Sequence, residues 1–161
     1  MRFSAIENRL IDHDYKFEQL FNALENNEIP QKGIFFDGQV FDAYEFTSKI
    51  IRSAKKSIIL IDNYIDESTL THLSKKRGNI QATLLCKSSN KQLELDLKRA
   101  NDQYGNFELK TFNKSHDRFL IIDQKEVYHL GASLKDLGKK WFAFSIMDKL
   151  SVEYILKAIE E

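Results

Sequence analysis

The sequence predicts an α/β fold with a mixed sheet, because short apolar runs alternate along the chain with longer segments of helical periodicity. Ser57–Ile61 is an apolar run of the kind that forms a strand buried on both faces. Lys91–Gln103 instead places Leu93, Leu97 and Ala100 on one face of a helix. A chain of 161 residues is long enough for one domain with a hydrophobic core and a short additional segment.

Residues 1–28 predict a helix that is separate from this domain. Apolar side chains and one histidine recur at alternating spacings of three and four, which is the pattern of a heptad seam. The seam consists of Phe3, Ile6, Leu10, His13, Phe17, Leu20 and Leu24. Such a segment forms either a coiled coil or an amphipathic helix that packs on its own domain, and both alternatives stay open. Asn26–Pro30 breaks the pattern, and the α/β domain is expected over residues 33–161.

The elements of the domain follow from periodicity and from turn residues. Asp42 with Glu45 three residues later fits a capping box, which predicts a helix from there to about Lys55. The other predicted elements are a strand at 57–61, a helix near 67–76, strands at 80–86 and 107–112 flanking the helix at 91–103, a hairpin of 118–122 with 126–130, a strand at 141–146 and a helix at 150–159. Buried strands separated by helices indicate an α/β sandwich.

Composition narrows the function classes. The chain carries 24 basic and 24 acidic residues, so any site for a polyanion has to be local. No apolar run is long enough for a signal peptide or a membrane span, and the single cysteine, Cys86, reads as a buried thiol in a reducing compartment. The sequence therefore predicts a cytoplasmic protein. It contains neither a glycine-rich phosphate loop nor a recognisable metal-ligand pattern, so no metal or cofactor is expected.

The segment from Ser115 to Lys135 contains the residues with the clearest chemistry. If Arg118–Ile122 is a strand, its alternation sends His116 and Arg118 to one face, and a hairpin could bring Ser133 to the same place. A nucleophilic imidazole with donors around the phosphoryl oxygens is what cleavage of a phosphodiester without a metal requires. The alternative is an ordinary hairpin turn at Asp123–Lys125, preceded by a surface or capping histidine.

These residues resemble the signature of the phospholipase D superfamily, which is His, any residue, Lys, four residues, Asp, about six residues and Gly-Ser. His116, Arg118, Asp123, Gly131 and Ser133 match one copy. The resemblance implies a phospholipase D-like α/β sandwich with a mixed sheet, preceded here by the N-terminal helix. It also implies a phosphodiesterase in which one His attacks phosphorus and a second His protonates the leaving group. Since one copy is present, the resemblance implies a homodimer that contributes His116 twice.

The chain departs from the signature in three places. Arg118 stands where the family has Lys, and a planar guanidinium is not interchangeable with an ammonium. Seven residues separate Asp123 from Gly131, and Ala132 precedes Ser133. Lys135 occupies roughly the position of the family's Asn.

A longer stretch, from about Gly33 to Asp148, resembles the C-terminal domain of bacterial, prophage-type DNA-binding proteins. The resemblance is carried by residues 32–38, 58–66 and 129–141. It implies nucleic acid as a partner, and a DNA-binding module ahead of this domain in a longer parent protein.

Other side chains could complete a phosphate site. Asn63 and Tyr64 directly follow the strand at 57–61, where ligand-binding groups of α/β sheets gather, although turns also favour such residues. Gly131 and Lys135 are expected beside them as substrate-binding residues.

Two further groups of residues have both a functional and a structural interpretation. His129 could serve as an acid or base within one subunit, but it is more typical of a core residue. Lys139 and Lys140 could form a basic rim with Trp141 or Phe142 available for stacking on a base, although Lys-rich turns are also common solvated surface.

Three hypotheses follow. The first is a metal-independent phosphodiesterase acting on nucleic acid through a phosphohistidine, with Arg118 and Ser133 holding the phosphoryl oxygens and Asp123 orienting or supporting the site. The second is a catalytically impaired domain of the same fold that binds nucleic acid or dimerises as part of a prophage-type regulator. The third is a structural oligomerisation domain assembled through residues 3–24.

Overall fold

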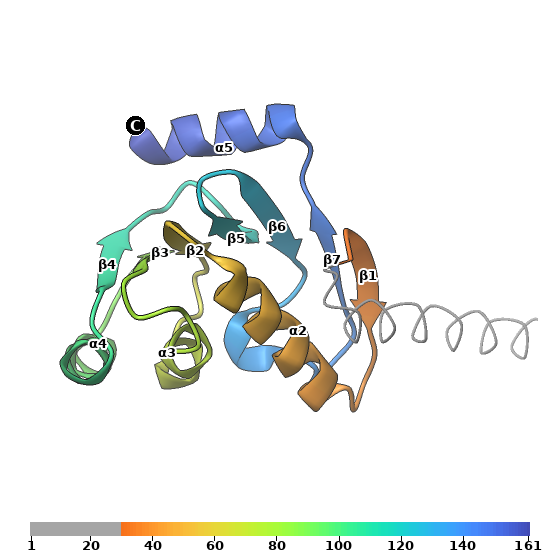
Figure 1. Ribbon diagram of the computed structural model, residues 1–161. Coiled ribbons are helices and arrows are strands. Elements are labelled where there is room, and N and C mark those ends of the chain that lie inside the picture. The colour runs from red at the N-terminus through yellow and green to blue at the C-terminus, as the bar shows by residue number, and fades with distance from the viewer. Residues whose placement is uncertain (1–29) are drawn as a thin grey trace, which may run out of the picture.

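A seven-stranded mixed sheet organises the computed structural model, which describes residues 30–161 (Figure 1). The strand order is β1-β7-β6-β5-β2-β3-β4. The strands are β1 (Lys32–Phe35), β2 (Ser57–Ile61), β3 (Gln81–Cys86), β4 (Phe107–Thr111), β5 (Arg118–Ile122), β6 (Glu126–Leu130) and β7 (Phe142–Ile146). The helices are α2 (Val40–Ser53), α3 (Glu67–Leu73), α4 (Lys91–Gln103), the 3₁₀ turn η1 (Leu134–Asp136) and α5 (Lys149–Glu160). The helix predicted for residues 1–28 lies outside the described residues.

The sheet has a parallel half and an antiparallel half that meet at β2. β2, β3 and β4 run parallel, since α3 and α4 supply the crossovers that parallel neighbours need. β5 pairs antiparallel with β2, and β6, β7 and β1 continue the antiparallel half. The predicted hairpin is confirmed with the bounds expected for both strands. Its turn uses left-handed backbone at Asp123 (φ 57°) and Gln124 (φ 54°), which suits the twist of a tight hairpin.

Helices cover the two faces of the sheet unequally. Figure 1 shows α2, α3 and α4 on one side of the sheet and α5 on the other. Because side chains alternate along a strand, Leu120 and Ile122 of β5 enter the core beneath α2 and α3. Ile121 of the same strand packs in a second cluster with Val152 of α5. Burial of each such side chain stabilises the fold by about 1.5–3 kcal/mol, which fixes the register of the central strands.

The predicted start of α2 and the capping box predicted there are wrong. α2 begins at Val40 and its N-cap residue, Gln39, makes no side-chain capping bond, so the expected capping box at Asp42 and Glu45 does not form. A capping box is found instead at α3, where the Asp66 carboxylate accepts from the backbone of Ser68 and Thr69. Within residues 30–161, no helix is sufficiently long and apolar to cross a bilayer.

A close backbone contact joins the segment after η1 to the start of α2. Gly138 has a positive φ of 79°, and a Cβ built there would lie 2.5 Å from the Cα of Val40. Only glycine combines this backbone conformation with this approach. The contact places the N-terminal end of α2 beside the residues that follow η1.

Candidate functional site

The candidate site forms at the strand ends where the parallel half of the sheet meets the antiparallel half. β2 pairs parallel with β3 and antiparallel with β5, so the end of β2 adjoins the start of β5 and the end of β6. Such a change in the sheet leaves a crevice beyond the strand ends, where α/β proteins bind ligands. The arrangement brings together residues that are far apart in sequence, namely Asp62, Arg118 and Ser133.

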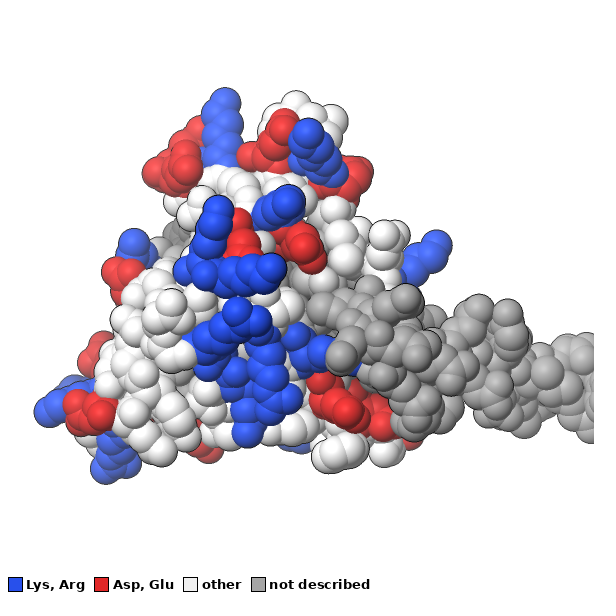
Figure 2. Space-filling model, viewed as in Figure 1, with Lys and Arg blue, Asp and Glu red and all other residues white. Residues whose placement is uncertain are grey.

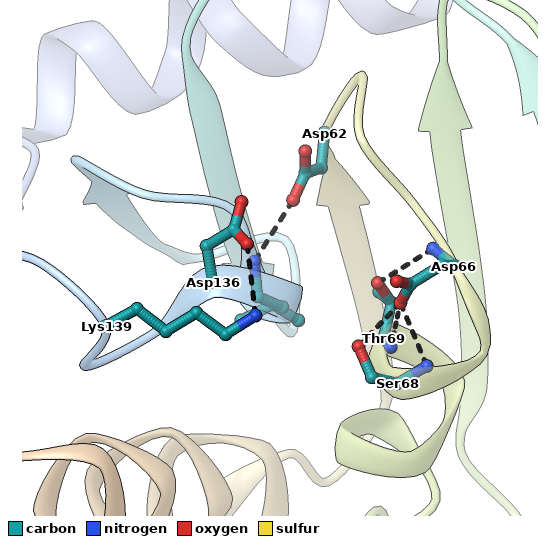
Figure 3. Close-up of polar contacts among 7 residues, drawn as sticks. Asp62, Asp66, Ser68, Thr69, Asp136 and Lys139 are labelled. Atoms are coloured by element: carbon teal, nitrogen blue, oxygen red, sulfur yellow. Dashed lines mark hydrogen bonds and ion pairs between the residues drawn. The ribbon is translucent and has the colours of Figure 1, made fainter.

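A chain of hydrogen bonds links these three side chains. The Ser133 hydroxyl donates to Asp62 Oδ1 at 2.9 Å and accepts from Arg118 Nε at 3.1 Å. Asp62 is fully buried, and its carboxylate also accepts from the backbone of Tyr64 at 2.9 Å and of Leu134 at 3.3 Å. Figure 3 shows the carboxylate of Asp62 at the end of β2, with a contact reaching toward η1. These donors compensate for burial of the carboxylate and give the Ser133 hydroxyl one orientation.

Tyr64 lies under two cations at the edge of this network. The guanidinium carbon of Arg118 is 6.0 Å from the centroid of the Tyr64 ring, and Lys135 Nζ is 5.6 Å from it. The face of an aromatic ring attracts cations within about 6 Å. Tyr64 is 58% exposed, so the ring holds both positive charges together at the surface.

A hollow of about 410 Å³ opens beside Arg118 and Ser133. Its volume is within the usual range for small-ligand sites, about 300–1,000 Å³. It is lined by Arg118, Gly131, Ala132, Ser133, Asp136, Lys139, Lys140 and Trp141. Asp136 pairs with Lys139 at 3.6 Å, as Figure 3 shows, which leaves the lining with an excess of positive charge. The hollow is therefore suited to an anion.

Gly131 is required by the closeness of β7. A Cβ on Gly131 would lie 2.9 Å from the carbonyl oxygen and 3.1 Å from the amide nitrogen of Ala143. The Gly131 amide instead donates to that carbonyl at 2.8 Å. Gly131 thus allows the chain to pass close to β7 after β6, on the way to Ser133 and its contact with Asp62. A glycine at this position therefore has a structural role in addition to lining the hollow.

His116 is exposed in the connection between β4 and β5, two residues before Arg118. It is not among the residues that line the hollow. The side chain of Asn63 binds Ser115, the residue before His116, because its Nδ2 donates to the Ser115 carbonyl at 3.1 Å. Its Oδ1 accepts from the Lys87 amide at 3.0 Å. Asn63 was expected to shape a phosphate pocket, but its amide is occupied in positioning the segment that carries His116.

Asp123 does not meet the other motif residues. It lies at the opposite end of β5, about 16 Å along a five-residue strand from the Arg118 end. Its carboxylate accepts from the backbone amides of Lys55, Lys56 and Ser57 at 2.7–3.1 Å. Burial would raise the pKa of Asp123, but these three donors outweigh it and the pKa is lowered. Asp123 was expected to orient or support the site, and in the structure its carboxylate fastens the connection between α2 and β2.

The other two described histidines have partners away from the hollow. His129 Nε2 is 3.5 Å from Asp117 Oδ2, and its ring lies 5.5 Å from that of Phe119, whose side chain packs toward α5. His72 lies 5.4 Å from the ring of Tyr44, and burial lowers its pKa. In residues 30–161, His116 is thus the histidine nearest in sequence to Arg118.

Two further expectations, for the stacking side chains and for Cys86, can be compared with the structure. Of the two aromatic candidates for stacking, Trp141 is 61% exposed whereas Phe142 is 4% exposed and belongs to the core. Cys86 is buried, and burial raises the pKa of its thiol. No group of three or more His, Cys, Asp or Glu side chains in the described part of the chain is arranged to hold a metal ion.

Asp62 is the site residue that sequence reasoning left out. The sequence places Asp62 directly after the apolar strand at 57–61, where turns also favour an aspartate. Its partner, Ser133, lies 71 residues further along the chain, so their contact depends on the strand order.

The sheet order and the helices on its two faces define a phospholipase D-like α/β fold. Among solved structures, the chain is similar to NucT from Helicobacter pylori, with a TM-score of 0.54 and 19% identity over 80% of this chain and 91% of that one. It is also similar to TrmBL2, an archaeal chromatin protein, with a TM-score of 0.52 and 16% identity over 96% of this chain and 62% of that one. At these identities the similarity establishes the fold alone.

No family model matches the chain. No curated protein matches it either.

Proposed function

We propose that this protein is a metal-independent phosphodiesterase that acts on nucleic acid, with an active site completed by two copies of the chain. The observation that carries the proposal is the Arg118–Ser133–Asp62 chain beside a cationic hollow. The fold shared with NucT supports it, as does the similarity to TrmBL2, whose structure is described as showing a novel mode of DNA binding.

In this proposal an imidazole nitrogen of His116 attacks phosphorus and forms a nitrogen–phosphorus bond. The phosphorus–oxygen bond to the departing strand breaks, and the imidazolium of His116 from the second copy gives that oxygen a proton. Water then attacks phosphorus, the nitrogen–phosphorus bond breaks, and the second imidazole takes the proton of the water. Arg118 and Lys135 stabilise the charge on the phosphoryl oxygens.

We infer a second copy of the chain because the other two described histidines contact other side chains. His129 is engaged with Asp117, and His72 is packed beside Tyr44. Both side chains thus have partners other than His116. An exposed His116 on a connection between strands is accessible to a second subunit.

The test is cleavage of labelled single-stranded and duplex DNA in the presence of a chelator. We expect wild-type protein to cleave, His116→Ala to lose cleavage, and His129→Asn to retain it. In dimers formed from mixtures of wild-type and His116→Ala chains, activity should follow the square of the wild-type fraction. A linear dependence, or a monomer in sedimentation experiments, would contradict the composite site.

A second candidate is the impaired module that binds nucleic acid without turnover. The observation that favours it is that Arg118, in place of the family's Lys, already donates to Ser133. In this case wild-type protein binds DNA and leaves it intact, and Arg118→Lys does not change the binding.

A further inference from the structure

A group of cations lies on a surface away from the hollow. Figure 2 shows Lys and Arg side chains gathered in the middle of the face over which α2 runs in Figure 1. We define the α2 basic patch as Arg52, Lys55, Lys56, Lys75 and Lys125. All are exposed except Lys75, which is half-buried. In a chain with formal net charge +0, such a cluster indicates a local site for negative charge.

The fold brings these cations together from three separate segments. Arg52 is in the last turn of α2, and Lys55 and Lys56 follow that helix directly. The Asp123 carboxylate binds the backbone amides of Lys55 and Lys56, so the turn that contains Lys125 is held beside them. Asp123 thus fixes the backbone from which these lysines project.

Lys75 joins the patch from the end of α3. Its Nζ lies 5.8 Å from the centroid of the Tyr44 ring on α2. A hydrogen bond from Lys75, and the positive charges of Lys75 and Arg52, lower the pKa of Tyr44. Both cations therefore act on one phenol at the surface of α2.

Carboxylates compensate the positive charge of the patch only in part, and the Asp123 carboxylate does interact with the charge of Lys56. The ion pairs found within residues 30–161 join other side chains, and none includes a member of the patch. Asp123 is directed at backbone amides, and Glu126 accepts from the Tyr128 hydroxyl at 3.2 Å. The exposed cations are thus available to an external polyanion.

The patch is a separate surface from the hollow. The N-terminal end of α2 contacts Gly138, close to the Lys139 and Lys140 that line the hollow. Arg52, Lys55 and Lys56 lie at the other end of this 14-residue helix, about 21 Å away, and Lys75 lies between the two ends, beside Tyr44. One nucleic acid of roughly six or more nucleotide steps could reach from one surface to the other.

We propose that the α2 basic patch binds the phosphate backbone of nucleic acid. The patch contains four lysines and one arginine, which suits contact with successive phosphates without reading of the bases. Binding at the patch does not require turnover at His116. An anionic membrane is the alternative partner, since the exposed Phe41 ring lies 6.4 Å from the Tyr44 ring that Lys75 contacts, and the vesicle measurement below separates the two.

The test is binding of a fluorescent DNA duplex at several salt concentrations, in a His116→Ala background. Triple substitution Lys55→Gln, Lys56→Gln, Lys125→Gln should weaken binding roughly tenfold or more and reduce the salt slope by about two to three. The matched control removes three exposed lysines elsewhere, at Lys91, Lys98 and Lys157, and should leave binding nearly unchanged. Circular dichroism and thermal melting establish that both variants are folded.

Three outcomes overturn the proposal. The first is that the patch variant binds DNA with the affinity and salt slope of its parent, and the second is that the control variant loses as much affinity as the patch variant. The third is that the patch substitutions abolish binding to vesicles containing phosphatidylserine while DNA binding is unaffected. Residual cleavage by His116→Ala would count against the proposed mechanism alone, because the patch is measured by binding.

Discussion

The two ends of β5 carry motif residues with different tasks. At the first end, Arg118 donates to Ser133 and lies over Tyr64 beside a cationic hollow. At the other end, Asp123 accepts from three backbone amides and closes the connection between α2 and β2. One short strand therefore separates a group suited to chemistry from a group that maintains the fold. Residues of one sequence motif therefore need not belong to one site.

The largest expected effect is at the Arg118 end. Arg118→Gln should reduce the rate of phosphodiester cleavage roughly 10²–10³-fold, because a donor to the developing negative charge is lost. Its unfolding free energy should change much less, since the Asp62–Ser133 hydrogen bond remains. The rate is measured by single-turnover cleavage, with Arg77→Gln as an exposed control. Cleavage by Arg118→Gln at the wild-type rate would remove Arg118 from the chemistry.

A smaller effect, on stability, is expected at the Asp123 end. Asp123→Ala should lower the free energy of unfolding by about 1–3 kcal/mol, because three backbone amides lose their acceptor. Asp123→Asn keeps an acceptor oxygen and should cost less. Chemical denaturation measures both, and cleavage per folded molecule should be unchanged. A variant that is fully stable but inactive would instead assign Asp123 to the site.

The smallest effect is the pH dependence of that stabilisation. The pKa of Asp123 is lowered in the folded protein, so its ionised form stabilises the fold above the ordinary value near 3.8. As the pH falls below 3.8 toward the lowered folded-state pKa, this contribution should disappear. Denaturation of wild-type and Asp123→Asn protein across this range should therefore show a stability difference that shrinks on acidification. If the difference in unfolding free energy between the two proteins persists at the lowest pH, the stabilisation by Asp123 does not depend on the charge of its carboxylate.

Local patterns predicted most of the elements. The bounds of β2, α4, β5 and β6 match those expected, because each is an apolar pattern bounded by turn or capping residues. The start of α2 was misplaced, since Asp42 and Glu45 imitate a capping box within the first turns of a helix that begins at Val40. The capping box at Asp66 was missed because Thr69, not Glu or Gln, completes it.

The candidate site was predicted only in part, because its contacts cross the sheet. The proximity of Arg118 and Ser133 follows from the hairpin, which the sequence indicated. The burial of Asp62 beneath Ser133 depends on β2 lying next to β5, and no local pattern encodes that neighbour. Asp123 could not be assigned to the fold either, since its partners at 55–57 precede it by 66–68 residues.

The pairing of β1 with β7 has a consequence for how the domain can be made. These two strands, the earliest and the last of the described sheet, lie side by side with Gly33 opposite Phe144. Closing so long a segment of chain carries an entropic cost that neighbouring hairpins do not have. During synthesis β7 is the last strand of this sheet to emerge from the ribosome. Until then β1 has no neighbour in the sheet, and a chain shortened by removal of β1 would leave β7 as an open, aggregation-prone edge.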